Sequence, residues 1–338
     1  MKKSKYIVLF SSLILLLGTQ MSCSDSYLEE KPMVKFSPEN LLTSKKGFET
    51  VIYSLHNFAR SGLFQSNNED VMNTGTDVAC SGVTDGRFFN DYSLILPEHA
   101  TPKFYWNWAY QKMLKDANLI ITRAENPNVS WTEDEKNTIV AEAKFFRAYT
   151  YNILVNLFGG LPIVDKEELS PRFDYTRASR KEVLEFIQKD LEFAAQYLPI
   201  VTSDASQDGR IFRAAANHLL SEVYISLGQE TGDQLFYDKS IAAATAVIDG
   251  SCGEYALVKS RFGDTSRPGD YYSDLFWTNQ QNRASGNKEG IWVVQFEYLI
   301  PGAEEANNAQ LRLWGPKIED VTYPDGKKIL VCDTVGRM

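Results

Sequence analysis

The segment AEAKFFRAYTYNILVNLFGGLPIV, residues 141–164, constrains the fold more strongly than any other part of the chain. Its apolar residues recur at helical spacing, which predicts one long helix. Gly159 and Gly160 end that helix, since glycine adopts the left-handed backbone of a helix cap, and Pro162 prevents continuation. Aromatic side chains point to several sides of the helix, which indicates burial among other helices.

Further helices are predicted on both sides of this segment. Two of them begin at capping boxes, in which two side chains bond each other's backbone N–H groups. These are Thr132 with Glu135 and Ser179 with Glu182. Apolar periodicity predicts the others over residues 44–61, 106–124, 212–227 and 235–249. The last two, rich in alanine and separated at a glycine, resemble a tetratricopeptide hairpin, so the chain is expected to be mainly α with tetratricopeptide-like helical hairpins.

Two stretches lack helical periodicity. Residues 63–102 are rich in glycine and small polar residues but contain aromatic side chains, which indicates a long ordered loop. Residues 251–338 are also punctuated by glycine. There, the β-branched and aromatic run at 291–298 predicts a strand, and residues 328–331 are a candidate partner strand. A little β structure is therefore expected near the C-terminus.

The N-terminal residues have the pattern of an export signal. A basic start precedes an apolar run at residues 6–18, which is too short to cross a bilayer as a helix. A small residue and Cys23 follow, as at a bacterial lipoprotein cleavage site, although glutamine replaces the usual leucine three positions before the cysteine. Residues 1–22 are therefore predicted to be a signal peptide and Cys23 to be lipidated. The alternative is ordinary secretion with an unmodified cysteine.

Composition argues against several classes of function. The formal net charge is −9, whereas nucleic-acid binding needs clustered lysine and arginine, so no nucleic-acid partner is expected. Only 3 histidines are present, and no metalloprotease, nucleophile-elbow or phosphate-loop motif occurs. The remaining cysteines, Cys80, Cys252 and Cys332, form no metal-binding or redox motif. We therefore expect no enzyme activity, no cofactor and no metal.

The segment at residues 141–164 resembles the signature of the SusD/RagB family of nutrient-uptake lipoproteins. In that family an A-E-A-[KR]-F-x-R-A helix ends in L-[FY]-G-G-[VL]-P. The residues that carry the match are Ala141, Glu142, Ala143, Lys144, Phe145, Arg147, Ala148, Tyr151, Leu157, Phe158, Gly159, Gly160 and Pro162. The start, from Cys23 to Pro32, and the region 271–292 also resemble the family. We interpret the signature as a folding element, in which Glu142 and Arg147 bond neighbouring helices or loop backbone.

The resemblance implies a cell-surface lipoprotein of the outer membrane, anchored by its lipid. Such proteins capture a nutrient, most often an oligosaccharide, and cap a SusC-like TonB-dependent transporter; they are not enzymes. Residues 23–250 would form the helical N-terminal domain. Residues 251–338 would begin a C-terminal region that continues further in the family, so the chain is expected to be truncated. Two alternatives are capture of oligopeptides on the same scaffold and a tetratricopeptide-like scaffold that binds only proteins.

Sugar binding needs flat aromatic faces beside planar polar groups, because a sugar ring stacks on the former and its hydroxyls bond the latter. Two loop segments hold this mixture. The ligand-binding candidates are Arg87, Phe88, Phe89, Asn90, Asp91 and Tyr92 in the first, and Tyr271, Tyr272, Trp277, Asn279 and Arg283 in the second. The structural alternative is that these aromatic residues pin their own loops to the helical body.

Overall fold

The structure is a computed structural model that describes residues 38–64, 93, 96–296 and 324. A short helix, α3 (Pro38–Leu41), belongs to a first unit of residues 1–41. All the elements described below belong to a second unit, residues 42–338. The predicted signal peptide, Cys23 and the candidates at 87–92 lie outside the described residues.

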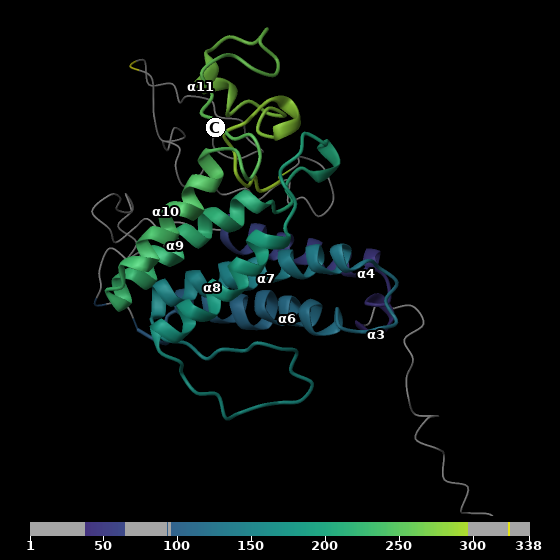
Figure 1. The fold of residues 1–338 in the computed structure, drawn as a ribbon, viewed down its shortest axis with the longest axis vertical. Coiled ribbons are helices and arrows are strands. Elements are labelled where there is room, and N and C mark those ends of the chain that lie inside the picture. Colours follow the sequence, from purple (N-terminus) through teal and green to yellow (C-terminus); the bar gives the residue numbers. More distant parts are fainter. Residues whose placement is uncertain (1–37, 65–92, 94–95, 297–323, 325–338) are drawn as a thin grey trace, which may run out of the picture. The chain divides into compact units, whose positions relative to one another are not determined.

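Helices dominate the second unit, as predicted (Figure 1). They are α4 (Lys45–Ala59), α5 (Ala100–Trp108), α6 (Leu114–Arg123), α7 (Glu133–Phe158), α8 (Arg180–Tyr197), α9 (Arg213–Thr231), α10 (Gln234–Ile248) and the short α11 (Tyr271–Asp274). Single π-helical turns extend α4 over Arg60–Phe64 and join α5 to α6 over Ala109–Met113. Both predicted capping boxes are present, at the starts of α7 and α8.

Successive helices pack against one another along the chain. Helix α7 lies against α4, α6 and α8, and the series continues from α8 to α9 and from α9 to α10 (Figure 1). The resulting hairpins agree with the predicted tetratricopeptide-like architecture. Phe146, Tyr151 and Leu154 of α7 are fully buried, which confirms that this helix is enclosed by its neighbours.

The sequence pattern predicts that the helix over residues 212–227 ends before Gly228, but in the structure α9 continues past this residue. The helix continues to Thr231 and is capped by Gly232, which has a left-handed backbone with φ 71°. Gly228 instead lies against the ring of Tyr237 on α10, where a Cβ atom would come within 2.8 Å of the ring. Its lack of a side chain therefore permits close packing of α9 and α10.

The predicted strand at 291–298 is not formed in its described part. Residues 291–296 are in no strand, and residues 297–298 and the candidate partner at 328–331 lie outside the described residues. A strand needs a neighbour to accept its backbone hydrogen bonds, and a β-rich composition does not supply one. In place of a ladder, the side chain of Trp292 packs on α7 and Gln295 bonds a nearby loop.

Candidate binding site

The signature helix α7 carries a buried arginine with several partners. Arg147 makes two hydrogen bonds to the Asp190 carboxylate on α8, at 2.6 and 2.8 Å. It also donates to the Asn118 side chain and to the backbone oxygen of Asp165, both at 2.7 Å. Lys144 shares the Asp190 carboxylate at 2.7 Å. Arg147 therefore joins α6, α7, α8 and the segment that follows α7, as expected for neighbouring helices and loop backbone.

Side chains from α7, from α6 and from the π-helical turn before α6 hold the segment that follows α7. The Tyr151 hydroxyl accepts a hydrogen bond from the backbone N–H of Val164 at 2.7 Å. Asn118 donates to the Val164 oxygen at 2.8 Å, and Tyr110 donates to the Pro162 oxygen at 2.7 Å. Burial raises the pKa of the Tyr151 hydroxyl, so it stays protonated. These contacts direct the chain away from the helix axis.

The two glycines of the signature have different roles. Gly159 caps α7 with φ 73°, a conformation that side chains disfavour. Gly160 passes so close to the chain at Ala178 that a Cβ atom would lie 2.2 Å from its backbone oxygen. The next residue, Leu161, exchanges two backbone hydrogen bonds with Ala178, at 3.0 and 2.9 Å. The Gly-Gly pair thus ends the helix and lets two segments meet.

A second buried charge of α7, Glu142, lies on a different side of the helix from Arg147. Its carboxylate accepts from Nε2 of His56 on α4 at 2.7 Å and from the Arg210 guanidinium, with two contacts at 3.1 Å. Burial alone would raise the pKa of Glu142, but the His56 hydrogen bond and the charge of Arg210 outweigh it and lower the pKa to about 2. Glu142 is therefore an anion whose hydrogen bonds hold His56 and Arg210 in place, and both residues line the cavity described below.

The second predicted loop exposes part of its aromatic set. Tyr271 and Tyr272 on α11 are 46% and 63% exposed, and Phe276 just after the helix is 66% exposed. The rings of Tyr272 and Phe276 contact each other edge to face, with centroids 5.2 Å apart. We call Tyr271, Tyr272 and Phe276 the aromatic platform. Phe276 was not among the candidates, although it lies within the same aromatic run.

The other candidates in this loop are partly engaged within it. Trp277 is half-buried, with the Arg267 guanidinium over its ring. Arg283 donates to the backbone oxygen of Glu254 and lies over the ring of Tyr255. Asn279 is exposed, in a left-handed backbone with φ 67°. Trp277 and Arg283 therefore have the contacts expected of residues that pin a loop.

Buried polar side chains hold the loop that carries the platform. The Asp274 carboxylate, at the end of α11, is fully buried and accepts from Arg261 at 2.6 Å and from the backbone of Phe262 at 3.2 Å. Gln280 is also buried and bonds the backbone on both sides of Gly263. The platform thus stands on a loop ordered by its own hydrogen bonds.

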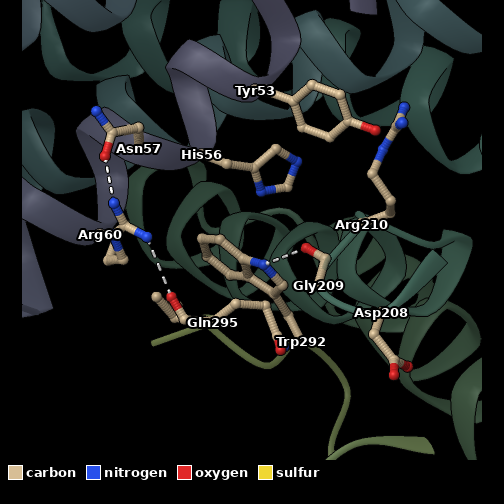
Figure 2. A pocket seen from close by; sticks show the side chains of 10 residues that line it. Tyr53, His56, Asn57, Arg60, Asp208, Gly209, Arg210, Trp292 and Gln295 are labelled. Atoms are coloured by element: carbon tan, nitrogen blue, oxygen red, sulfur yellow. Dashed lines mark hydrogen bonds between the residues drawn. The ribbon is translucent and has the colours of Figure 1, made fainter. Parts of the chain in front are cut away.

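A cavity of about 320 Å³ lies beside α4, where three segments of the second unit meet (Figure 2). Its lining residues are Tyr53, His56, Asn57, Arg60, Asp208, Gly209, Arg210, Trp292, Val294 and Gln295. The Trp292 indole lies in the middle of the view in Figure 2, with Asn57 and Arg60 on one side and Asp208 and Arg210 on the other. Burial raises the pKa of the Asp208 carboxyl.

None of the cavity residues was a predicted site residue. Trp292 and Gln295 lie in the stretch predicted to be a strand. Tyr53, Asn57 and Arg60 lie in the stretch predicted to be a helix, and that prediction rested on its apolar residues alone. The one available signal was polar: Tyr53, Asn57 and Arg60 recur at steps of three and four along α4 and the π-helical turn that extends it. Only the fold shows that this stripe faces residues more than a hundred positions later.

The fold defines the class of protein: a scaffold of helical hairpins with a loop that exposes aromatic side chains. Within the described residues, no cluster of histidine, cysteine and acidic side chains has the arrangement needed to hold a metal. In the same part of the chain, no helix combines the length and hydropathy needed to cross a membrane.

Comparison with known proteins identifies the family. The SusD-like family model described as "Starch-binding associating with outer membrane" matches residues 26–225, which is more than half of the chain. The chain therefore belongs to the SusD-like family, a family of binding proteins rather than enzymes, as its signature predicted.

Curated relatives agree with this assignment. SusD-like protein P2 of Formosa agariphila is 26% identical over 305 residues, covering 86% of this chain and 53% of that protein. A SusD-like protein of Bacteroides ovatus is 26% identical over 229 residues, covering 66% of this chain and 39% of that protein. The chain thus spans about half the length of the first of these relatives and 39% of the second.

Solved structures share the fold. A SusD-like carbohydrate-binding protein from Bacteroides fragilis superposes with a TM-score of 0.60 at 19% identity, over 87% of this chain and 56% of that one. A structure solved with a xylogluco-oligosaccharide superposes with a TM-score of 0.57 at 18% identity, over 82% of this chain and 50% of that one. These similarities establish the helical fold.

Proposed function

We propose that this protein captures oligosaccharides at the bacterial surface and delivers them to a SusC-like TonB-dependent transporter. Lipidation of Cys23 would anchor it in the outer membrane with its binding loops exposed. The SusD-like family and its association with the outer membrane support this role. The relative solved with a xylogluco-oligosaccharide supports the ligand class.

The observation that carries the proposal is the aromatic platform of Tyr271, Tyr272 and Phe276. Large apolar side chains are rarely gathered on the surface without a binding role. Aromatic rings offer flat apolar faces on which the C–H face of a sugar ring stacks, and tyrosine adds a hydroxyl for hydrogen bonding. The buried contacts of Asp274 and Gln280 order the loop in advance, which reduces the entropy lost on binding.

Native affinity electrophoresis tests this function. Residues 24–338 would be run through gels that contain single polysaccharides, including starch, xyloglucan and laminarin. We expect selective retardation in at least one gel and its reduction by Tyr271→Ala combined with Tyr272→Ala. Phe173→Ala is the matched control, since Phe173 is 93% exposed in another loop.

Two outcomes would contradict the proposal. A compact band that no polysaccharide retards would exclude glycan capture by this chain. Equal retardation of the wild type and the double variant would move the binding surface away from the platform. The transporter is tested separately, by co-purification of the lipidated protein with a large membrane β-barrel from the native outer membrane.

A further inference from the structure

The cavity beside α4 has the two kinds of surface that sugar recognition requires. Its apolar faces are the rings of Tyr53 and Trp292 (Figure 2). Its polar groups include the Asn57 amide, the Arg60 guanidinium and the Asp208 carboxylate. Amides, guanidinium groups and carboxylates are planar, and each offers hydrogen bonds in fixed directions to neighbouring hydroxyls.

The cavity walls are held in place by bonds to the surrounding structure. The Trp292 indole donates to the backbone oxygen of Gly209 at 3.2 Å and contacts the rings of Phe145, Phe146 and Tyr149 on α7. Arg60 donates to the Asn57 side chain at 2.6 Å and to the backbone oxygen of Gln295 at 3.4 Å (Figure 2). Such a site is formed before a ligand arrives.

Gln295 also connects the cavity to the loop that carries the platform. Its amide exchanges two hydrogen bonds with the Asn282 amide, at 3.0 and 2.9 Å. Gly209 leaves room for this arrangement, since a Cβ atom there would lie 2.7 Å from the Gln295 side chain. The position of the cavity wall thus depends on the same loop that presents Tyr271 and Tyr272.

The charges around the cavity indicate a neutral ligand. Two guanidinium groups, Arg60 and Arg210, and one carboxylate, Asp208, contribute to the lining. Glu142 is not itself in the lining, but its carboxylate bonds the lining residues Arg210 and His56. Its negative charge therefore offsets one of the guanidinium groups. The local charges therefore nearly balance, which disfavours a strongly anionic ligand such as a polyuronate.

We propose that this cavity is a second saccharide site, distinct from the aromatic platform, which accepts one or two units of a neutral oligosaccharide. Its volume of about 320 Å³ lies at the small end of the range of ligand pockets, so it admits only a short part of a glycan chain. The inference rests on the proposed function, because it assigns to the same protein a second contact with the same class of ligand.

Two variants on the exposed side of α4 test the cavity. Tyr53→Ala and Asn57→Ala remove a ring and an amide from residues that are exposed, so neither change leaves a hole in the core. Maltoheptaose and a xyloglucan oligosaccharide serve as neutral probes, with trigalacturonate as the acidic comparison. Isothermal titration calorimetry should show a neutral probe bound about tenfold more weakly by each variant, whereas Phe173→Ala should bind it as the wild type does.

Hydroxyl-radical footprinting of the wild type gives an independent readout. An occupied cavity should slow oxidation of Tyr53 but leave Tyr175 unchanged, since Tyr175 lies in a loop away from the lining. A neutral probe that binds with unchanged affinity in both variants and leaves Tyr53 unprotected would overturn the second site while preserving the proposed function. Binding of trigalacturonate in preference to the neutral probes would overturn the ligand class. Failure of the wild type to bind any glycan, either here or in the affinity gels, would overturn both proposals.

Discussion

At the scale of single residues, the charged side chains of α7 separate into two groups. Glu142 and Arg147 are buried and each bonds several elements, whereas the other charged side chains of the helix keep some exposure to solvent. An uncompensated charge in the interior is costly, so both residues require their partners. Their spacing of five along the helix sends them to opposite sides, where they organise different parts of the protein.

Removal of the Asp190 charge should destabilise the protein strongly. Asp190→Asn leaves the buried Arg147 and the neighbouring Lys144 without their carboxylate, and we expect a loss of about 3–5 kcal/mol in the free energy of unfolding. Urea denaturation followed by circular dichroism measures this loss. Asp174→Asn is the control, because it removes an exposed ion pair with Arg172 and should change stability little. Equal effects of the two substitutions would contradict the role assigned to Arg147.

Glu142 should make stability depend on pH in the acid range. Its pKa of about 2 in the folded protein lies below the ordinary value of 4.5, so the unfolded state takes up this proton first as the pH falls. The stabilisation is fully present above about pH 4.5 and is lost between there and about pH 2. Its magnitude is on the order of 3 kcal/mol, from about 1.4 kcal/mol for each unit of pKa.

The measurement for Glu142 is a difference between two proteins. Unfolding free energies of the wild type and Glu142→Gln would be compared from pH 6 down to the lowest pH at which both fold. The wild type should be more stable at pH 6, and the gap should narrow below about pH 4.5, because Gln cannot ionise. A gap that stays constant over this range would show that the Glu142 carboxylate is not held ionised by His56 and Arg210.

At the scale of elements, the end of α7 is determined by how closely two segments approach. The helix stops at Gly159, but the direction taken afterwards depends on the bonds from Tyr110, Asn118 and Tyr151 to the departing chain. Gly160 permits the pairing of Leu161 with Ala178, which places the loop before α8. The Gly-Gly-Leu-Pro motif therefore combines a helix cap with a contact between segments.

Two alanine substitutions distinguish the free-energy cost of a steric clash from the cost of a strained backbone conformation. Gly160→Ala should cost about 3 kcal/mol, since the new Cβ atom would lie 2.2 Å from a backbone oxygen that a rotamer change cannot relieve. Gly232→Ala should cost only about 1 kcal/mol, because its φ is +71° but the new Cβ atom would have no atom within 4 Å apart from its chain neighbours. Thermal or urea unfolding measures both. A milder effect at Gly160 than at Gly232 would contradict the close approach.

At the scale of the whole molecule, the proposed anchor and the proposed binding surfaces lie on different parts of the chain. Cys23 precedes the first unit's only described helix, α3, whereas the platform and the cavity belong to the second unit. Membrane attachment should therefore be separable from glycan binding. The sequence between Cys23 and α3 is polar and contains Pro32, as a tether would.

Cys23→Ala should release the protein from the outer membrane. The proposed acylation at Cys23 would supply the membrane affinity, at about 0.8 kcal/mol for each buried CH₂ group. Fractionation of cells that express each variant, together with metabolic labelling by a fatty acid, measures attachment. Ser24→Ala is the control that leaves Cys23 in place. Membrane retention and labelling of the Cys23→Ala protein would contradict lipidation there.

The sequence by itself determined the helices, the capping boxes and the family, because each depends on residues that are close along the chain. Apolar periodicity, Thr132 with Glu135, Ser179 with Glu182 and the run at 141–164 are all local patterns. The sequence also identified Tyr271 and Tyr272 as binding candidates from their chemistry, and the fold leaves both exposed.

Only the tertiary structure decided which distant residues meet. It placed Gly228 against Tyr237 rather than at a helix end, and it packed Trp292 on α7 where a strand had been predicted. It also brought Tyr53 and Asn57 of α4 together with Asp208 and Gln295 around one cavity. The physical reason is that packing and charge pairing join residues far apart in sequence, whereas caps and helix periodicity act within one or two turns.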